Sequence, residues 1–409
     1  MKPVWIVNHY AIDPTESNSG SRHFSLARRL AELGWSPVIF AASTAHPSGK
    51  QRTATSRRVS ERSRDGVLFR YLRSPKYTNG FSRVINMLCF SVQLLSPAAT
   101  RGLPRPQVII GSTVHPIAAW AASVLARRLV VPFVFEIRDL WPQTLIDMGK
   151  FGEQSIPARL MRLLEKSLCN RSARIITLLP FAHEYLARQG VPSEKVFWIS
   201  NGTDLDEFSN MPTADDKCFI VKYLGSIGQA NGVETILQSF LAAAERDPHM
   251  RLEIIGNGSE RLELEKEASQ AQHGDRVTFR DPVVKSAVPQ VISNADALII
   301  NILDLDVYRY GVSMNKLFDY AAAGRPIVLA SNARNNLVVE ANAGITVPAN
   351  DASALRDALV SMAESDNSAR RAQWGANARS HVAAHYDYRI LGTRLHQLLH
   401  DVVEQEDNR

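Results

Sequence analysis

The sequence predicts an α/β protein made of two Rossmann-like, doubly wound domains, and three observations support this. The first half alternates short apolar runs with stretches whose apolar residues recur at helical spacing. The same rhythm restarts after about residue 215. The chain has 409 residues, which is too many for one ordinary hydrophobic core and comfortable for two domains. Such alternation is typical of parallel sheets covered by helices on both faces.

The first domain is predicted over residues 1–200. It opens with the strand VWIVNHY, a polar loop, and the helix-like stretch HFSLARRLAELG, which ends at Gly34. Residues 46–66 are polar and basic and predict an exposed, mobile loop. The other predicted strands are SPVIFAAS, VLFRYL, QVIIGST, PFVFEIRD and RIITLL, and the other predicted helices are AAWAASVLARRL and IPARLMRLLEKSLCNRSA.

The second domain is predicted over residues 201–385, and we expect a C-terminal helix over 386–409 to pack back toward the first domain. The predicted strands here are FIVKYLGS, RLEIIGNG, RVTFRD, SNADALIINI and PIVLA. Ligands of parallel sheets bind at the carboxyl ends of the strands. Two such sheets therefore suggest a cleft between the domains, with one substrate on each wall.

Composition and charge narrow the class of protein. Apolar residues make up 45% and charged residues 22%, as in ordinary soluble proteins. Residues 1–200 carry 27 Lys and Arg against 12 Asp and Glu, whereas the remainder carries 20 against 29. This asymmetry predicts different partners for the two halves, unless both are simply solvated surfaces. The three cysteines form no metal or redox motif, which favours a reducing compartment without disulfides.

Two glycine-bearing loops follow neighbouring predicted strands of the second domain. YLGSIGQANGVETIL places Gly225 and Gly232 between a strand and a helix, and EIIGNGSE repeats the pattern one unit later. Backbone amides and a helix start in such loops attract phosphate. A plain tight turn is the alternative for either loop alone.

The stretch NKLFDYAAAGRPIVLA supplies a third loop. Ser313 can cap a helix whose free amides are those of Met314, Asn315 and Lys316, and that end would attract an anion. Asp319 lies three residues beyond Lys316 on the same helix face, where a carboxylate suits a ribose diol. The alternative is a simple surface pair between Lys316 and Asp319.

Polar residues in the first domain follow the predicted strand ends. FVFEIRDLWP brings Glu136, Arg138 and Asp139 to the rim of the expected cleft, unless they form an ion pair that locks the loop. TESNSGSRHFS, around Arg22, either holds a phosphate, leaves room for an acceptor, or is a flexible loop.

The stretch FSRVINMLCFSVQLL, residues 81–95, has Arg83 near its start and mixed apolar residues. It suits a helix lying on an anionic membrane surface. An ordinary buried helix is the alternative.

Together these stretches resemble the family-four retaining glycosyltransferases of the GT-B fold, along nearly the whole chain. The strongest marks are FVFEIRDLWP, ISNGTDLDEF, YLGSIGQANGVETIL, IIGNG and NKLFDYAAAGRPIVLAS. The nearest likeness is to the fucosamine-transferase-like branch of O-antigen and capsule biosynthesis. This resemblance implies two Rossmann-like domains facing an interdomain cleft, a nucleotide sugar as donor substrate, UDP-sugar above all, and neither cofactor nor metal.

The resemblance also implies roles for individual residues. Asp139 and Glu136 would be catalytic. The donor would be bound by Gly225, Ser226, Ile227, Asn231, Gly256, Asn257, Ser313, Asn315, Lys316 and Asp319. The acceptor would be bound by Gly20, Ser21, Arg22, His115 and Arg138. The donated sugar would be an N-acetylated amino or deoxy sugar, and the acceptor a saccharide or a polyprenyl-diphosphate-linked sugar.

The sequence departs from the family pattern at three positions. Gly311 stands where the family often has a glutamate, and Ser226 and Asn231 stand where it has arginine and lysine. Lys316 would replace part of that charge. These departures keep open a nucleotide-sugar sensor without activity, and the same fold also serves sugar-nucleotide 2-epimerases. A nucleic-acid-binding protein is disfavoured because no recognition motif occurs. We expect a cytoplasmic protein, peripheral on the inner face of the membrane.

Overall fold

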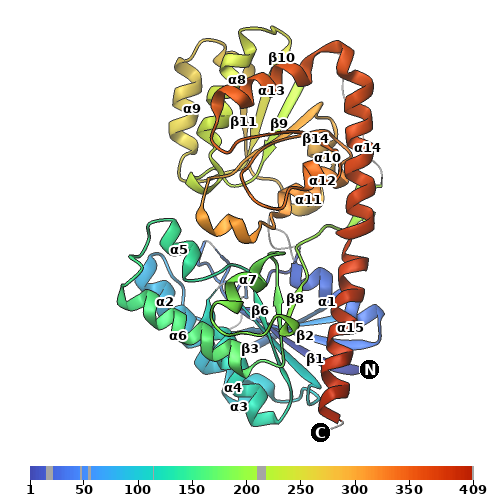
Figure 1. Cartoon of the computed structure of the whole chain (residues 1–409). Helices are drawn as coiled ribbons and strands as arrows, with labels where there is room; N and C mark the ends of the chain where they lie inside the picture. Colours follow the sequence, from blue (N-terminus) through green and yellow to red (C-terminus); the bar gives the residue numbers. More distant parts are fainter. Residues whose placement is uncertain (15–21, 47, 54–56, 114, 210–217, 408–409) are drawn as a thin grey trace. The chain divides into compact units, whose positions relative to one another are not determined.

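The computed structural model describes residues 1–14, 22–46, 48–53, 57–113, 115–209 and 218–407 (Figure 1). The predicted GT-B fold class is confirmed, because the chain forms two Rossmann-like α/β units with parallel sheets. The first unit comprises residues 1–200 together with 388–409, and the second comprises residues 201–387.

The first unit is built on an eight-stranded sheet in the order β3-β4-β2-β1-β5-β6-β7-β8. Its central strand β1 pairs in parallel with β2 and β5, so that Ile6 stands opposite Ile39 and Ile110. The strands are β1 (Lys2–Val7), β2 (Trp35–Ala42), β3 (Val59–Arg64), β4 (Val67–Leu72), β5 (Val108–Ser112), β6 (Phe133–Ile137), β7 (Arg174–Thr177) and β8 (Val196–Trp198). The helices are α1 (Arg22–Glu32), α2 (Gly80–Leu94), α3 (Pro97–Thr100), α4 (Pro116–Leu129), α5 (Gln143–Asp147), α6 (Ile156–Arg171), α7 (Ala182–Ala187) and α15 (Tyr388–Asp407).

Helices cover both faces of this sheet (Figure 1). On one face, α1 and α15 pack together, and leucines of α15 join the same apolar cluster as Leu26 and Leu30 of α1. On the other face, α4 packs against β5 and β6, with α2 and α6 on either side of it. Gly111 of β5 lets α4 approach closely, because a β-carbon there would lie 3.0 Å from Ala122 Cβ.

The second unit has a six-stranded sheet in the order β11-β10-β9-β12-β13-β14, all parallel. Its strands are β9 (Phe219–Leu224), β10 (Met250–Ile255), β11 (Val277–Arg280), β12 (Ala297–Asn301), β13 (Ile327–Ala330) and β14 (Gly344–Val347). Its helices are α8 (Val233–Ala244), α9 (Arg261–Gln270), α10 (Val288–Ser293), α11 (Asn315–Ala322), α12 (Leu337–Glu340), α13 (Ala352–Ala363) and α14 (Ser368–His385). Apolar clusters fill both faces of this sheet as well.

Two local expectations were wrong. Part of the loop expected over 46–66 is strand β3, which pairs antiparallel with β4 at the edge of the sheet. A charged edge strand can leave one face in solvent, so its sequence lacks the apolar run of a central strand. The alternative of an ordinary buried helix for residues 81–95 is wrong as well, because α2 buries Phe90 and Leu94 but exposes five other large apolar side chains, from Phe81 to Val92.

None of the helices in the described part of the chain has both the length and the apolar character needed to cross a lipid bilayer.

Candidate functional site

In the second unit, the loops that follow β9 and β10 pack directly against each other, backbone to backbone. The Ile227 N–H donates to the Asn257 carbonyl at 2.9 Å. A β-carbon on Gly256 would lie 1.8 Å from the Gly225 carbonyl oxygen, and one on Gly258 would lie equally close to the Ile227 carbonyl oxygen. Glycine is therefore required where the loops touch, and the two loops form one continuous backbone surface at the carboxyl edge of the sheet.

Lys316, in the first turn of α11, reaches into this surface. Its ammonium donates to the Tyr223 hydroxyl at 2.9 Å and to Asn231 Oδ1 at 2.7 Å, and it lies 4.5 Å from the centre of the Tyr223 ring. A β-carbon on Gly225 would lie only 2.9 Å from Lys316 Nζ. Burial of this ammonium lowers the pKa of Lys316 to about 7. Three residues expected to bind the donor, Gly225, Asn231 and Lys316, are thus brought together.

The helix start differs from the expected one. α11 begins at Asn315, and Met314 precedes it without a side-chain cap among the described residues. The expected cap by Ser313 is wrong, because the Ser313 hydroxyl accepts the Asn201 N–H at 2.9 Å instead. Asn201 also donates through Nδ2 to the Ser313 carbonyl at 2.7 Å. The first amides of α11 have no acceptor within the helix, which leaves partial positive charge beside Lys316.

Asp319 does not pair with Lys316. It is buried, and its carboxylate accepts from Lys285 Nζ at 2.5 and 2.6 Å and from the Thr203 hydroxyl at 2.9 Å. The surface pair considered above is therefore excluded. A ribose diol would have to share the Asp319 oxygens with Lys285 or take its place.

The remaining expected donor residues lie around the same edge. Ser226 and Asn257 are exposed, whereas Ile227 is buried beneath the loop. The Ser226 carbonyl accepts from the Tyr223 hydroxyl at 2.6 Å, and Asn257 Oδ1 accepts the Gly258 N–H at 2.8 Å. Both loops are therefore held by internal bonds before any ligand binds.

In the first unit, Glu136 at the end of β6 is the centre of a buried polar network. Arg22 Nε donates to Glu136 Oε1 at 3.0 Å, and the Ser112 hydroxyl donates to Oε2 at 2.5 Å. His23 Nε2 lies 2.6 Å from Oε2, and its other ring nitrogen accepts from Asn8 Nδ2 at 2.9 Å. His23 is thus a neutral donor in this arrangement, and burial lowers its pKa.

Burial alone would raise the pKa of Glu136. The charge of Arg22 and the hydrogen bonds from His23 and Ser112 outweigh it, and the pKa of Glu136 lies well below its usual value. We attribute this mainly to Arg22, since His23 is neutral. Both oxygens of Glu136 are occupied by protein donors, so its geometry suits a residue that positions its neighbours.

Asp139 lies three residues beyond Glu136 and is exposed. The Arg138 N–H donates to the Thr113 hydroxyl at 2.9 Å, which ties this loop to the end of β5. Of the two carboxylates expected to be catalytic, Asp139 is the one that solvent can reach.

Those of the expected acceptor-binding residues that the structure describes are not gathered in one exposed site. Arg22 is 3% exposed, and its guanidinium holds the Ile199 and Ser200 carbonyls in addition to Glu136. His115 caps α4 by accepting the Ala118 N–H, and its ring packs on His9. Burial lowers the pKa of His115 well below its usual value. Gly20 and Ser21 lie outside the described residues.

The sequence prediction missed Lys285, Thr203 and Tyr223. Tyr223 and Lys285 could have been proposed as polar groups at or just after strand ends. Thr203 precedes the second unit's first strand and carried no comparable signal. No group of three or more His, Cys, Asp or Glu side chains able to hold a metal ion occurs in the described part of the chain.

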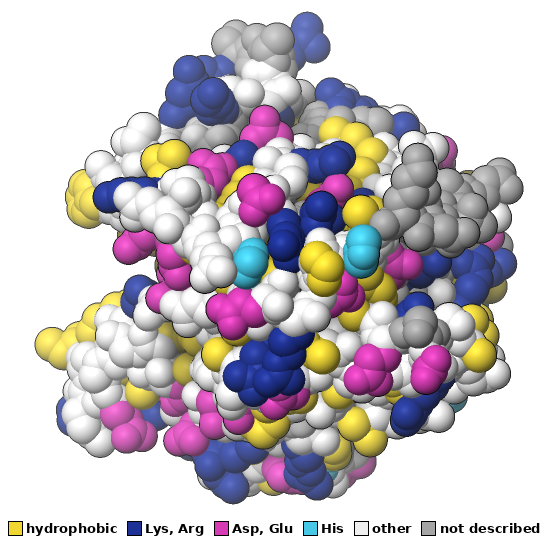
Figure 2. Space-filling view, turned by 90° about the horizontal axis from the view of Figure 1, so that it is seen from above, with side chains coloured by type: hydrophobic (Ala, Val, Ile, Leu, Met, Phe, Trp, Pro, Cys, Tyr) yellow, Lys and Arg dark blue, Asp and Glu magenta, His cyan; other side chains and the backbone are white. Residues whose placement is uncertain are grey.

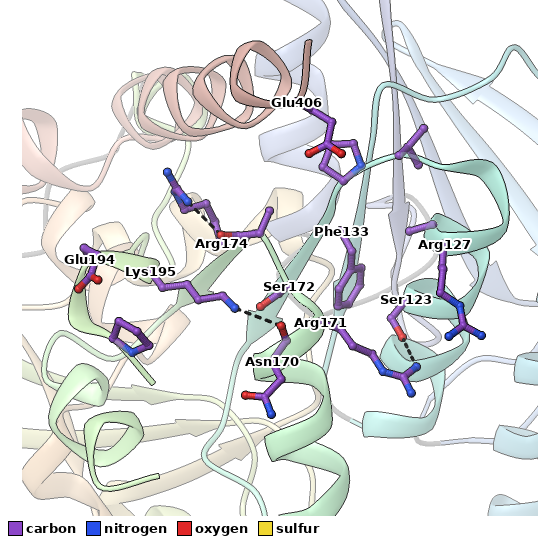
Figure 3. Close-up of a pocket in the computed structure, with 15 residues that line it drawn as sticks. Ser123, Arg127, Phe133, Asn170, Arg171, Ser172, Arg174, Glu194, Lys195 and Glu406 are labelled. Carbon is purple, nitrogen blue, oxygen red and sulfur yellow. Dashed lines mark hydrogen bonds between the residues drawn. The ribbon is translucent and has the colours of Figure 1, made fainter. Parts of the chain in front are cut away.

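A cavity of about 720 Å³ in the first unit lies at the opposite, amino edge of β6, β7 and β8 (Figure 3). Arg171 points toward Ser123 there, and Lys195 points toward the Asn170 carbonyl, to which it donates at 3.5 Å. Lys195 also donates to the Cys169 carbonyl at 2.6 Å. Lys195 lies at the carbonyl end of α6, where a positive side chain offsets the helix dipole. Because the cavity lies at the amino edge of the sheet, it is separate from the candidate site residues at the carboxyl edge.

The chain has the fold of the GT-B glycosyltransferases. Sucrose-phosphate synthase from Thermosynechococcus elongatus is similar with a TM-score of 0.76, at 19% identity, over 99% of this chain and 100% of that one. Anabaena HepE in complex with UDP-glucose is similar with a TM-score of 0.69, at 11% identity, over 98% and 100%. These likenesses define the fold.

Two family models match the sequence. One is the glycosyl transferase 4-like domain, over residues 20–202, and the other is glycosyl transferases group 1, over residues 218–365. The first half of the chain thus contains a glycosyl transferase 4-like domain, and the second half contains a domain of the glycosyl transferases group 1.

The individual relatives described next have low sequence identity to this chain, 22% and 24%. The probable glycosyltransferase WbjE of Pseudomonas aeruginosa is 22% identical over 382 residues, which is 90% of each chain. The putative colanic acid biosynthesis glycosyl transferase WcaI of Escherichia coli K12 is 24% identical over 209 residues. That match covers 48% of this chain, and the chain spans about half, 51%, of the length of WcaI.

The contact between the two glycine loops leads to a first prediction. Gly256→Ala places a β-carbon against the Gly225 carbonyl at a backbone φ of +156°, so the substitution should lower the free energy of unfolding by at least about 1–3 kcal/mol. Gly228→Ala is the matched control, because its β-carbon would lie 3.5 Å from the Ser259 hydroxyl. Urea unfolding of both variants measures the difference. Equal stability of the two would contradict the close packing of the loops.

Proposed function

We propose that this protein transfers a sugar from a nucleotide-diphosphate donor, and that the second unit binds the donor. The observation that carries the proposal is the position of Lys316. Its side-chain nitrogen lies between the Gly225 loop and the start of α11, where it meets backbone amides of both. This combination suits the diphosphate of a nucleotide sugar. UDP-sugar is the proposed donor, which the UDP-glucose complex of the similarly folded HepE supports.

Lys316 also accounts for the departure at position 231. Where family members have a lysine in the first loop, Asn231 accepts a hydrogen bond from Lys316 Nζ. The positive charge is thereby supplied from α11 instead of from the loop. This supports an active donor site over a silent one.

We propose a retaining transfer in which the leaving diphosphate gathers negative charge as its bond to the anomeric carbon breaks. The amides of the loop and of α11, together with Lys316, would stabilise that charge without a metal ion. The acceptor hydroxyl would attack from the leaving-group side, and a phosphate oxygen would take its proton. Exclusion of water during this step would limit hydrolysis of the donor.

For the first unit we propose acceptor binding, with Asp139 beside the reacting centre. Its exposed carboxylate could orient the acceptor hydroxyl or stabilise positive character at the anomeric carbon. Glu136, in contrast, would fix the end of β6 and so hold Asp139 in place.

The proposed acceptor is a saccharide or a polyprenyl-diphosphate-linked sugar, and the donated sugar an N-acetylated amino or deoxy sugar. The positive charge of residues 1–200 suits an anionic acceptor. The names of WcaI and of the lipopolysaccharide glycosyltransferase WaaG, a structural neighbour, support a role in surface polysaccharide, O-antigen or capsule biosynthesis. We propose a cytoplasmic location, which the three free thiols support.

The donor is tested by thermal shift with UDP, GDP, ADP and their sugars. A ligand at about 100 times its Kd adds about 2.7 kcal/mol to the free energy of unfolding. Because UDP-sugar is the proposed donor, we expect UDP compounds to raise the melting temperature most. If no nucleotide changes the melting temperature, the donor site is wrong. Incubation of the preferred UDP-sugar without acceptor tests the alternative, because a 2-epimerase would release a free epimerised sugar.

A second experiment addresses Lys316. With a pKa of about 7, its ammonium loses its proton as pH rises from 7 to 8.5, and a bound diphosphate restores it. UDP affinity, measured by calorimetry, should therefore fall about 10- to 20-fold across this range. The terminal phosphate of UDP is already ionised there.

Lys316→Met should bind UDP about 10- to 100-fold more weakly at pH 7 and lose this pH dependence, because charge-assisted hydrogen bonds are removed. Lys266→Met, at an exposed position of α9, is the control and should behave as the wild type. A wild-type profile in Lys316→Met would exclude the phosphate contact.

A third experiment addresses Asp139. Asp139→Ala should reduce acceptor-dependent release of UDP by about 100-fold or more, while UDP affinity stays within about twofold. Glu194→Ala, an exposed carboxylate at the amino edge of the same sheet, is the control. Turnover equal to that of the control would remove Asp139 from the reaction.

A further inference from the structure

The outward face of α2 is apolar throughout. Phe81 is 78% exposed and Val92 69%, and Val84, Ile85 and Leu88 between them are 41–47% exposed. The spacing of these residues places them on one side of the helix. The side that faces the protein is partly polar: Asn86 is buried and bonds to His9, to the Thr44 hydroxyl and to the Pro75 carbonyl. The protein-facing side also buries Phe90 and Leu94, so α2 is apolar on both sides, unlike a helix whose outer face meets water.

Helix α6 carries a second exposed apolar stripe. Ile156 is 74% exposed, Leu160 61% and Leu163 65%, one or two helical turns apart. Basic side chains flank this stripe, because Arg159 and Lys166 are also exposed. Glu165, the acidic residue of this helix, is buried and accepts from the Tyr185 hydroxyl.

The two stripes belong to one side of the first unit. Both α2 and α6 pack against α4, and Figure 1 shows them along the same side of the sheet. Other exposed surface is different: Figure 2 shows a face on which basic and acidic side chains are interspersed, with small apolar areas between them. We refer to the outward faces of these two helices, residues 81, 84, 85, 88 and 92 with 156, 160 and 163, as the α2–α6 surface.

The charge of this surface restricts its partner. On these two fully described helices every exposed charged side chain is basic. A second copy of the chain, docked by two-fold symmetry, would bring these like charges together, which is unfavourable. An anionic lipid surface instead offers apolar chains for the stripes and phosphate headgroups for the arginines and lysine.

We propose that the α2–α6 surface docks this protein on an anionic lipid bilayer, with both helices lying in the interface. The proposal rests on the proposed function, since a polyprenyl-linked acceptor would be held in such a bilayer. Arg83, in the first turn of α2, donates to the Tyr10 hydroxyl just beyond the carboxyl end of β1. The docked helix is therefore connected to the edge of the sheet at which we propose that the acceptor binds.

Flotation of the full chain with phosphatidylcholine vesicles, with and without phosphatidylglycerol, tests this proposal. We expect binding to the anionic vesicles that weakens as salt rises. The triple variant Val84→Gln, Leu88→Gln, Val92→Gln should bind at least about tenfold more weakly, because the inserted apolar area is lost. The double variant Arg159→Glu, Lys166→Glu should bind about tenfold more weakly and lose most of the salt dependence.

Matched controls lie in the second unit. Leu262→Gln replaces a leucine of α9 that is 82% exposed, and Lys266→Glu reverses an exposed charge on the same helix. Both should bind vesicles like the wild type. Wild-type binding by the triple variant would overturn the proposal. The proposal would also be overturned if no form of the protein bound vesicles and the wild type formed a dimer that the triple variant did not form. That result would assign the surface to a second copy.

The UDP-induced thermal shift of the same variants separates this proposal from the proposed function. A normal shift without vesicle binding means that the docking surface is wrong while donor binding stands. Vesicle binding without any shift in the wild type means that the donor site is wrong while the surface stands. A normal shift in the triple variant also shows that it is folded.

Discussion

The carboxyl edge of the first sheet depends on the buried ion pair between Arg22 and Glu136. It joins the first turn of α1 to the end of β6, and the remaining donors of Arg22 hold the Ile199 and Ser200 carbonyls, where the first unit leads into the second. Loss of one partner of such a pair leaves a buried charge unpaired, which typically costs about 3–5 kcal/mol. The pair adds little stability over apolar packing, but it fixes the strand end from which Asp139 extends.

The fold could be predicted from the sequence to the extent that local patterns determine it. Apolar runs and helical spacing gave the order of most strands and helices, because parallel strands buried on both faces are apolar throughout. The edge strand β3 was missed for the opposite reason: its exposed face is charged, and Arg62 and Arg64 bind Asp13 from another part of the chain. For α2 the sequence left open a helix on a membrane surface and an ordinary buried helix, because apolar composition alone does not decide whether an apolar face meets the protein or another surface.

The candidate site was predictable where its residues lie close together in the sequence. Gly225 and Lys316 follow from loop and helix-start patterns. The partners of Asp319 do not, because Lys285 and Thr203 are 34 and 116 residues away along the chain. Ser313 was assigned to the helix as a cap because local sequence cannot reveal that Asn201 binds its hydroxyl. Such long-range hydrogen bonds depend on tertiary packing, which the local pattern of a single sequence does not predict.

The packing of α15 on α1 has a consequence for synthesis on the ribosome. The second unit is an insertion in the chain of the first, because residues 388–407 complete the apolar cluster around Leu26 and Leu30. A nascent chain that has released residues 1–200 therefore still exposes the surface that Leu391, Leu395 and Leu399 later cover. The inserted unit can fold on emergence, whereas the first must wait for the last helix. Exposed apolar surface of this kind is a target for chaperones until translation ends.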